Sequence, residues 1–210
     1  MPNDLTLKLL ERTAQTFADR GLDTFDTIRP ETMSEEPENT IAWPLDSRAS
    51  DGLPLVRMGQ DLVLGQPLGR GGMGEVFVAT QASLDREVAV KVLMRARAPA
   101  DVGALLREAR ITGSLQHPNI VPVHQLGRDE AGDPVLVMKR IEGHRWSDLL
   151  DETPCVDGPE LERHLAILED ICQAVHYAHT RGVVHRDIKP ENVIVGEFGE
   201  VVLLDWGIAA

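Results

Sequence analysis

The chain has 210 residues, which is enough for one sizeable hydrophobic core or for one domain with a tail. Its 34 acidic and 21 basic residues give a net charge of -13, which argues against a nucleic-acid-binding protein, because such proteins carry basic patches. An acidic surface is usually just a soluble one and identifies no partner.

The cysteine content and the hydropathy of the chain indicate in which cellular compartment it is expected. The two cysteines, Cys155 and Cys172, form neither a metal-ligand spacing nor a disulfide framework, which favours a reducing cytosol. No apolar run approaches the roughly 20 residues of a transmembrane helix. The first residues, from Met1 to Asp4, lack the charged-then-apolar pattern of a signal peptide. We therefore expect a cytoplasmic chain with no membrane segment within residues 1–210.

Residues 1–58 differ in composition from the rest of the chain. Apolar residues between Leu5 and Phe17 predict one short amphipathic helix. The stretch that follows is rich in prolines and acidic residues, and such a composition cannot bury enough surface to fold. We interpret residues 1–58 as a flexible acidic tail and favour a plain linker over a regulatory role. Residues 59–210 are expected to form one domain.

Strands dominate the first part of this domain. Two apolar runs joined by a glycine cluster predict a β-hairpin within residues 61–79, and residues 87–93 predict a third strand. Apolar residues at helical spacing predict a helix over residues 100–115, with Asp101 near its start. Two further strands are expected at 120–127 and 134–138. The fold class is therefore α+β, with a five-stranded antiparallel sheet and one helix over about residues 59–141.

The second part, about residues 142–210, is expected to be mainly helical. Its clearest helix spans residues 160–181, and Gly182 is expected to end it. Two short strands are expected at 193–195 and 201–204. The apolar residues predicted to share one face of the long helix are Leu161, Leu165, Leu168, Ile171, Cys172 and Val175.

A glycine motif joins the first two predicted strands. Gly69, Gly71 and Gly74 have GxGxxG spacing, which also occurs in dinucleotide-binding proteins, but there the glycines open a helix. Here residues 75–79 are rich in β-branched and aromatic types, so the glycines lie at a hairpin tip. Such a tip can lie close over a triphosphate, because backbone N–H groups without Cβ atoms approach the oxygens. On this motif alone, an ordinary glycine-rich hairpin is an equal alternative.

A lysine on the third predicted strand needs an anionic partner. Lys91 lies in an apolar strand, where an unpaired ammonium is costly. Glu108, on the following helix, is the candidate carboxylate, and a lysine so held can be aimed at the α- and β-phosphates of a nucleotide. An exposed strand lysine and a solvated helix glutamate are the alternatives.

The most specific segment is a polar loop between two apolar runs, residues 185–192. Asp187 can accept a proton from a hydroxyl, Lys189 can neutralise a migrating phosphoryl group, and Asn192 offers an oxygen to a hard cation. Asp205 follows a strand and is suited to Mg²⁺. Loops held by a rigid scaffold are where chemistry tends to be located, so we expect these side chains to act together.

Together these motifs resemble the protein-kinase family, specifically the bacterial Ser/Thr kinases of eukaryotic type, over about residues 61–210. The resemblance implies a protein-kinase-like fold, with an N-lobe over about 59–141 and a partial C-lobe over about 142–210. It implies transfer of the ATP γ-phosphoryl group to Ser/Thr hydroxyls of protein substrates. The implied metal is Mg²⁺, or Mn²⁺ in its place.

The resemblance also implies a role for each matching residue. Asp187 would orient and deprotonate the substrate hydroxyl and Lys189, typical of Ser/Thr rather than Tyr kinases, would assist it. Lys91 with Glu108 would fix the phosphates, and Asn192 and Asp205 would hold the metal. Met138 would guard the back of the adenine pocket. The implied nucleotide-binding residues are Leu68, Gly69, Gly71, Gly72, Met73, Gly74, Val76, Ala89, Lys91, Met138, Lys139, Ile141 and Ile194.

The sequence departs from the family pattern at three places. The expected hinge begins Lys139-Arg140 where family members often carry an acid and an aromatic residue, and Trp206 stands where phenylalanine follows the metal-binding aspartate. The sequence also stops three residues after Gly207, so we expect a kinase domain truncated after its Asp-Trp-Gly motif, in which Arg186 would lack the activation-loop phosphate it meets in such kinases.

Three interpretations stay open at this point. The first is an active Ser/Thr kinase whose remainder lies outside this chain, favoured by the full set of catalytic residues. The second is a catalytically incomplete fragment that acts as a nucleotide-binding or regulatory interaction module. The third is a decayed fragment that does not fold alone. The protein substrate, the input signal and the oligomeric state have no indicator in the sequence.

Overall fold

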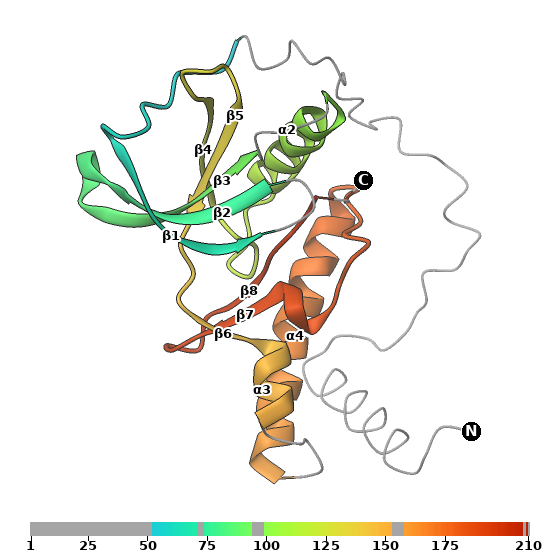
Figure 1. Cartoon of the computed structure of the whole chain (residues 1–210). Coiled ribbons are helices and arrows are strands. Elements are labelled where there is room, and N and C mark those ends of the chain that lie inside the picture. Colours follow the sequence, from blue (N-terminus) through green and yellow to red (C-terminus); the bar gives the residue numbers. More distant parts are fainter. Residues whose placement is uncertain (1–51, 71–73, 94–98, 153–157, 208, 210) are drawn as a thin grey trace. The chain divides into compact units, whose positions relative to one another are not determined.

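The computed structural model describes residues 52–70, 74–93, 99–152, 158–207 and 209 of the chain (Figure 1). The predicted N-terminal helix and nearly all of the predicted tail lie outside these residues, as do Gly71, Gly72 and Met73 of the glycine motif. In the part that is described, we find no helix with the length and apolar character needed to cross a bilayer.

A five-stranded antiparallel sheet forms the first half of the described structure. Its spatial order is β1-β2-β3-β5-β4. A short 3-10 helix, Ala82–Leu84, joins β2 to β3, and one helix, α2 (Pro99–Ser114), follows β3. The strands are β1 (Leu62–Arg70), β2 (Gly74–Gln81), β3 (Arg86–Leu93), β4 (Val123–Arg128) and β5 (Pro134–Lys139).

The two faces of this sheet have different cores, because side chains alternate along each strand. On one face, Val88 and Val90 of β3 pack with Val135 and Val137 of β5 in a cluster that also contains Leu62 and Ala79. The opposite face is covered by α2, where Leu105 and Ala109 pack on Leu136, with Met138 beside them. The sheet is therefore buried on both sides at its centre, which explains why β3 and β5 are valine-rich.

The segment before β1 covers the β4 edge of the sheet. The Val56 amide donates to the carbonyl of Arg128 at 2.7 Å, and the Arg128 amide donates to the carbonyl of Pro54 at 2.9 Å. The Val56 side chain is buried in the valine cluster. Ordered packing therefore begins several residues before residue 59, where the sequence pattern put the start of the domain.

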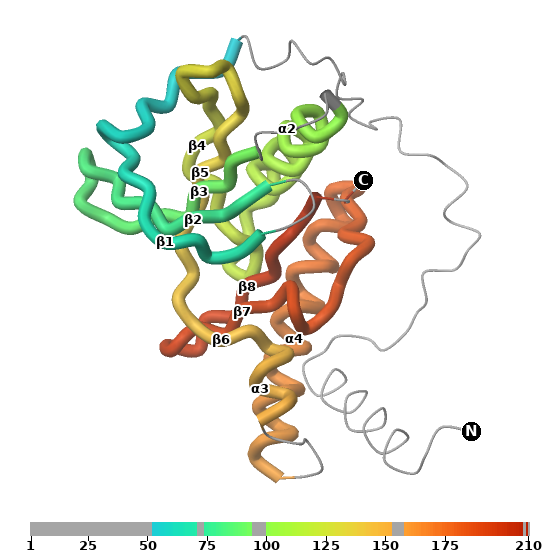
Figure 2. The backbone as a smooth tube through the Cα atoms, viewed as in Figure 1, coloured from blue at the N-terminus to red at the C-terminus, as the bar shows by residue number. Residues whose placement is uncertain are grey.

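The second half contains a three-stranded sheet and two helices. The sheet has the order β6-β7-β8 and is antiparallel. Figure 2 traces the chain from β5 through residues 140–142 into β6 and α3. The elements are β6 (Gly143–Arg145), α3 (Trp146–Glu152), α4 (Gly158–Thr180), the 3-10 helix η4 (Pro190–Asn192), β7 (Val193–Gly196) and β8 (Val201–Leu203).

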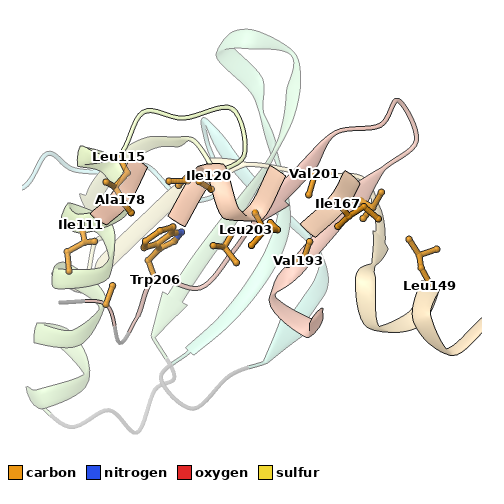
Figure 3. Close-up of a cluster of buried hydrophobic side chains, with 14 residues drawn as sticks. Ile111, Leu115, Ile120, Leu149, Ile167, Ala178, Val193, Val201, Leu203 and Trp206 are labelled. Carbon is orange, nitrogen blue, oxygen red and sulfur yellow. The ribbon is translucent and has the colours of Figure 1, made fainter. Parts of the chain in front are cut away.

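A shared core joins the two halves. Ile111 from α2, and Leu115 and Ile120 just after this helix, pack with residues of α4, β7 and β8 around Trp206 (Figure 3). Hydrogen bonds support this packing, since the Leu203 amide donates to the carbonyl of Asn119 at 2.8 Å and the Asn119 side-chain amide donates to the carbonyl of Val201 at 2.8 Å. Helix α2 therefore contributes to both cores.

The α+β class, with a five-stranded antiparallel sheet, one helix and a following helical part, is confirmed. The prediction that Gly182 ends the long helix is also borne out, since Gly182 has φ +73° and its amide donates to the carbonyl of His179. Strand β6 was not predicted, because three exposed residues carry no alternation that could reveal a strand.

The predicted apolar face of α4 is partly confirmed, since Leu161 and Ile171 are buried, but the buried side as a whole is rotated by part of a turn. Leu168 is 37% exposed and Cys172 is exposed, whereas Ile167, Ala174 and Ala178 are buried. The helix carries apolar residues on several of its sides, so the sequence alone does not identify the side that packs against the core. The small Ala174 and Ala178 side chains belong to the core around Trp206, and small side chains let a helix lie close to its neighbours.

Truncating Val56 should destabilise the fold. The side chain is 4% exposed, so Val56→Ala should lower the free energy of unfolding by about 1–3 kcal/mol through lost burial and an unfilled cavity. Urea denaturation measures this. The neighbouring Leu55, 48% exposed, gives the control, since Leu55→Ala should change it by less than about 0.5 kcal/mol. Equal losses in both variants would contradict the packing of this segment on the sheet.

Candidate active site

A buried ion pair links the first sheet to α2. The Lys91 ammonium donates to both carboxylate oxygens of Glu108, at 2.7 Å each. The two side chains are only 13% and 7% exposed. Burial raises the pKa of the Glu108 carboxyl above its ordinary value, while the Lys91 charge lowers it in part and Asp205 raises it further. The predicted Lys91–Glu108 pair is thus present as a direct contact.

Strand register places several predicted nucleotide-binding residues on one face of the sheet. Val76 lies opposite Lys91, and Ala89 lies opposite Met138. Directly opposed residues of antiparallel strands project on the same face, and residues two apart along a strand share it. Val76, Ala89, Lys91 and Met138 therefore line one face, and Gly69 of β1 lies opposite Val76.

The second described glycine of the motif is required by close packing. A Cβ atom added at Gly74 would overlap the carbonyl oxygen of Val92 and approach its carbonyl carbon to 3.2 Å. No other residue type fits here without moving β3. Gly74 therefore fixes how the hairpin tip joins the strand next to Lys91.

Three side chains of the polar loop form one hydrogen-bonded group. Lys189 donates to Oδ2 of Asp187 at 2.7 Å. Asn192 donates to the same oxygen at 3.0 Å and to the main-chain carbonyl of Asp187 at 2.9 Å. The bond from Lys189, followed by the bond from Asn192, lowers the pKa of the Asp187 carboxyl, and the Asp187 carboxylate in turn raises the pKa of Lys189. Asp187 is therefore held as an oriented, ionised carboxylate.

Asn192 and Asp205 meet at one edge of the second sheet. Asn192 immediately precedes β7 and Asp205 follows the end of β8, and these strands are antiparallel, so the two positions are neighbours. The Leu204 amide donates to the carbonyl of Asn192 at 2.8 Å, which joins the two segments directly. Asp205 has a left-handed backbone, with φ +59°. Because Asp205 affects the pKa of Glu108, its carboxylate also lies within electrostatic reach of the Lys91–Glu108 pair.

His185 connects the polar loop to the Asp205 segment. Its Nε2 lies 3.0 Å from the carbonyl oxygen of Leu204, and its Nδ1 accepts from the Asp187 amide at 3.2 Å. The second bond requires an unprotonated Nδ1, so the ring is neutral with the proton on Nε2. The imidazole is buried, and its ring centroid lies 4.5 Å from that of Trp206 in an edge-on arrangement.

Sequence reasoning assigned no role to His185. The residue was noted only as part of the polar loop, because nothing in the spacing indicates that its ring is buried. The signal that could have found it is the position of an imidazole between an apolar run and a carboxylate. A residue there can accept from the loop backbone on one ring nitrogen and donate on the other.

The predicted hinge carries two paired cations. Lys139 forms an ion pair with Glu200 of the β7–β8 turn, and Arg140 pairs with Glu87 of β3 and, at 3.1 Å, with Glu142. The charges that depart from the family pattern are therefore neutralised by the protein's own carboxylates. Ile141, between them and β6, is half-buried.

The remaining predicted nucleotide-binding residues lie on other strands or outside the described part of the chain. Ile194 lies on β7 of the second sheet, opposite Val202 of β8, and Leu68 is exposed on β1. Gly71, Gly72 and Met73 lie outside the described residues. The roles predicted for all of these residues stay predictions.

The amino-acid sequence of this chain is similar to those of several known proteins. A family model described as protein kinase domain matches residues 62–210. Serine/threonine-protein kinase PknD of Protochlamydia amoebophila is 35% identical over 171 residues, which cover 76% of this chain and 17% of that protein. PknD of Chlamydia trachomatis serovar D is 42% identical over 156 residues, covering 68% of this chain and 16% of that protein.

A third relative comes from a different organism. A probable serine/threonine-protein kinase of Streptomyces coelicolor is 42% identical over 160 residues, which cover 73% of this chain and 23% of that protein. The chain thus spans between about a sixth and a quarter of the length of these curated relatives.

Acidification should act on the fold through His185. Burial lowers the pKa of this imidazole below its ordinary value of 6.5, so the folded state binds fewer protons than the unfolded state just below that pH. The stability that His185 contributes is therefore present above 6.5 and is lost as pH falls through the lowered value. The difference in free energy of unfolding between the wild type and His185→Gln should shrink from about pH 8 to about pH 5. Urea denaturation across that range measures it, and a constant difference would contradict a neutral buried ring.

Proposed function

The chain belongs to the protein kinase domain family, and we propose that it transfers the γ-phosphoryl group of ATP to Ser or Thr hydroxyls of protein substrates. The observation that carries this proposal is the Asp187 carboxylate, oriented by Lys189 and Asn192 and linked through Asn192 and Leu204 to the segment of Asp205. Protein kinases in general use ATP with Mg²⁺. The free thiol of Cys172 agrees with the cytoplasmic setting that we also propose.

Asp187 is the residue we assign to the acceptor hydroxyl. Among the described residues, the side-chain bonds to its carboxylate end on Oδ2, which leaves Oδ1 to accept the hydrogen bond of a substrate hydroxyl. As the bond from the acceptor oxygen to the γ-phosphorus forms, the bond from that phosphorus to its β–γ bridging oxygen breaks. ADP leaves with the electron pair, and the hydroxyl proton passes to Asp187. Lys189, beside this carboxylate, offsets negative charge on the transferred group.

Lys91 is the residue we assign to the α- and β-phosphates. An ammonium has one more N–H group than its two bonds to Glu108 use, so a donor remains for a phosphate oxygen. Because Glu108 holds the ammonium from both carboxylate oxygens, that donor has a fixed direction, and positioning is most of what phosphoryl transfer needs. Val76, Ala89 and Met138, on the same face, would contact the adenine with Ile194, and Lys139 and Ile141 would present the hinge backbone.

The chemistry of Asn192 and Asp205 fits a hard cation. The amide nitrogen of Asn192 is used on Asp187, so its side-chain oxygen is the atom left for a metal, and Asp205 adds a carboxylate. No cluster of three or more His, Cys, Asp or Glu side chains suited to a metal occurs in the described part of the chain. Mg²⁺ commonly binds through one or two protein oxygens together with substrate phosphates, and it would neutralise charge between the β- and γ-phosphates.

Replacing Asp187 should stop transfer while the fold persists. Asp187→Asn keeps the size of the side chain but removes the proton acceptor, and we expect a fall in rate of at least about 10²-fold. The assay is transfer of labelled γ-phosphate from Mg·ATP to a Ser/Thr-rich protein, or to the chain itself. Asp151→Asn makes the same chemical change at an exposed position of α3 and should leave the rate unaltered. Persisting transfer in Asp187→Asn, or none in the folded wild type, would refute the proposed function.

Replacing Lys91 separates phosphate positioning from proton acceptance. Lys91→Met removes the ammonium and fills its apolar surroundings, so transfer should fall by about 10²-fold or more. The pKa of Glu108 should rise further, because the cation that lowers it is gone. The same transfer assay measures the first effect, and an unchanged rate would exclude the assigned role.

Replacing Asp205 tests the metal assignment. In the wild type, Mg²⁺ should strengthen nucleotide binding, and Asp205→Asn should abolish most of that dependence because an amide oxygen binds a hard cation more weakly than a carboxylate. Titration of a fluorescent ATP analogue with and without Mg²⁺ gives the two affinities. If the variant keeps the full dependence, Asp205 is not a metal ligand.

A further inference from the structure

Arg145 lies beside the polar loop but is not part of the hydrogen-bonded group formed by Asp187, Lys189 and Asn192. Arg145 is the last residue of β6, and its Nη1 donates to the main-chain carbonyl of Glu191 at 3.3 Å. Glu191 is the residue between Pro190 and Asn192 in η4. Arg145 is therefore fixed to the same short loop that carries the proposed catalytic carboxylate, while its side chain is exposed.

The backbone of Arg145 is held from both sides. Arg145 pairs with Ile194 of β7, the strand that begins directly after Asn192. The next residue, Trp146, opens α3, and its indole Nε1 donates to Nδ1 of the buried His164 on α4 at 2.8 Å. A side chain that starts from a fixed backbone loses less conformational entropy when it binds a ligand.

Charge pairing distinguishes Arg145 from four other cations of the candidate site and its hinge. Lys91, Lys139, Arg140 and Lys189 each form an ion pair with a carboxylate of the chain. Arg145 bonds instead to a carbonyl oxygen, and no carboxylate within the described ranges pairs with it. In a chain of net charge -13, it is thus an unneutralised cation beside the loop.

We propose that Arg145 makes this loop selective for Ser or Thr acceptors that are flanked by acidic residues. A guanidinium has a planar fork of N–H donors that matches a carboxylate, and the carbonyl of Glu191 occupies only part of it. A peptide with glutamate near the acceptor can neutralise Arg145, whereas a lysine at that position is repelled. This selectivity rests on the proposed kinase function, because it concerns the substrate of the same site.

Matched peptides test the selectivity. Three synthetic peptides carry one serine flanked on both sides by Glu, Gln or Lys, and kcat/KM is measured for each with the full chain and Mg·ATP. The wild type should favour the Glu peptide over the Lys peptide by about two- to fivefold, the range of an exposed ion pair. Arg145→Glu should invert that ratio. The control Arg57→Glu changes the net charge equally at an exposed position before β1 and should keep the wild-type ratio.

Binding of the same peptides separates this inference from the proposed function. Fluorescence anisotropy of labelled peptides, with Mg²⁺ and a non-hydrolysable ATP analogue, should give the same order of affinity and the same inversion in Arg145→Glu. Selective binding without transfer would refute the kinase activity of the chain but support the role of Arg145. Equal affinities and equal turnover of the three peptides, or the same change in Arg57→Glu, would overturn the inference. Absence of both binding and transfer would overturn both proposals.

Discussion

Leu204 holds the candidate active site together through its backbone N–H and C=O groups. Its amide donates to the carbonyl of Asn192, and its carbonyl accepts from Nε2 of His185. Both hydrogen bonds reach the loop that carries Asp187, so one residue of the chain connects this loop to the segment of Asp205. The ring of His185 completes the connection by accepting from the Asp187 amide. The loop of Asp187 and the segment of Asp205 are therefore held in a fixed arrangement relative to each other.

The Lys91–Glu108 pair imposes a second constraint, between the sheet and α2. Taking both charges out of water costs several kcal/mol, and their attraction recovers this only with good geometry. Both carboxylate oxygens are bonded here, yet burial still raises the pKa of Glu108, so desolvation is not fully offset. An apolar pair of similar volume would often be at least as stable. The charges of Lys91 and Glu108 are thus better explained by the positioning of the Lys91 ammonium than by the stability of the fold.

The sequence was informative where a residue contradicted its surroundings. A lysine in an apolar strand required an anion, which made Glu108 its candidate partner, and the resemblance to protein kinases implied the same pair. The polar loop was recognisable because it interrupts two apolar runs. Alternating and valine-rich strands, together with the glycine hairpin, were enough for the first sheet.

What could not be predicted depended on tertiary packing. The predicted buried side of α4 was only partly correct, because apolar residues occur on several sides of that helix and the choice depends on which neighbours pack against Ala174 and Ala178. The role of His185 depends on a backbone carbonyl 19 residues away in the chain, which leaves no local pattern. Strand β6, and with it the position of Arg145, depends on pairing with β7, and three exposed residues have no periodicity of their own.

Several energetically unfavourable features occur at the same place in the fold. Asp205 and Arg186 both have left-handed backbones, with φ +59° and +69°, a conformation that costs a residue with a side chain about 1–2 kcal/mol. The indole N–H of the buried Trp206 has no hydrogen-bond partner among the described residues, which costs about 1–3 kcal/mol more. Burial of the Trp206 ring among Ile111, Leu115 and Ala178 compensates for these costs. Because unfavourable conformations persist only where the surroundings enforce them, their concentration around Asp205 and the Asp187 loop supports the assignment of the active site to this edge of the second sheet.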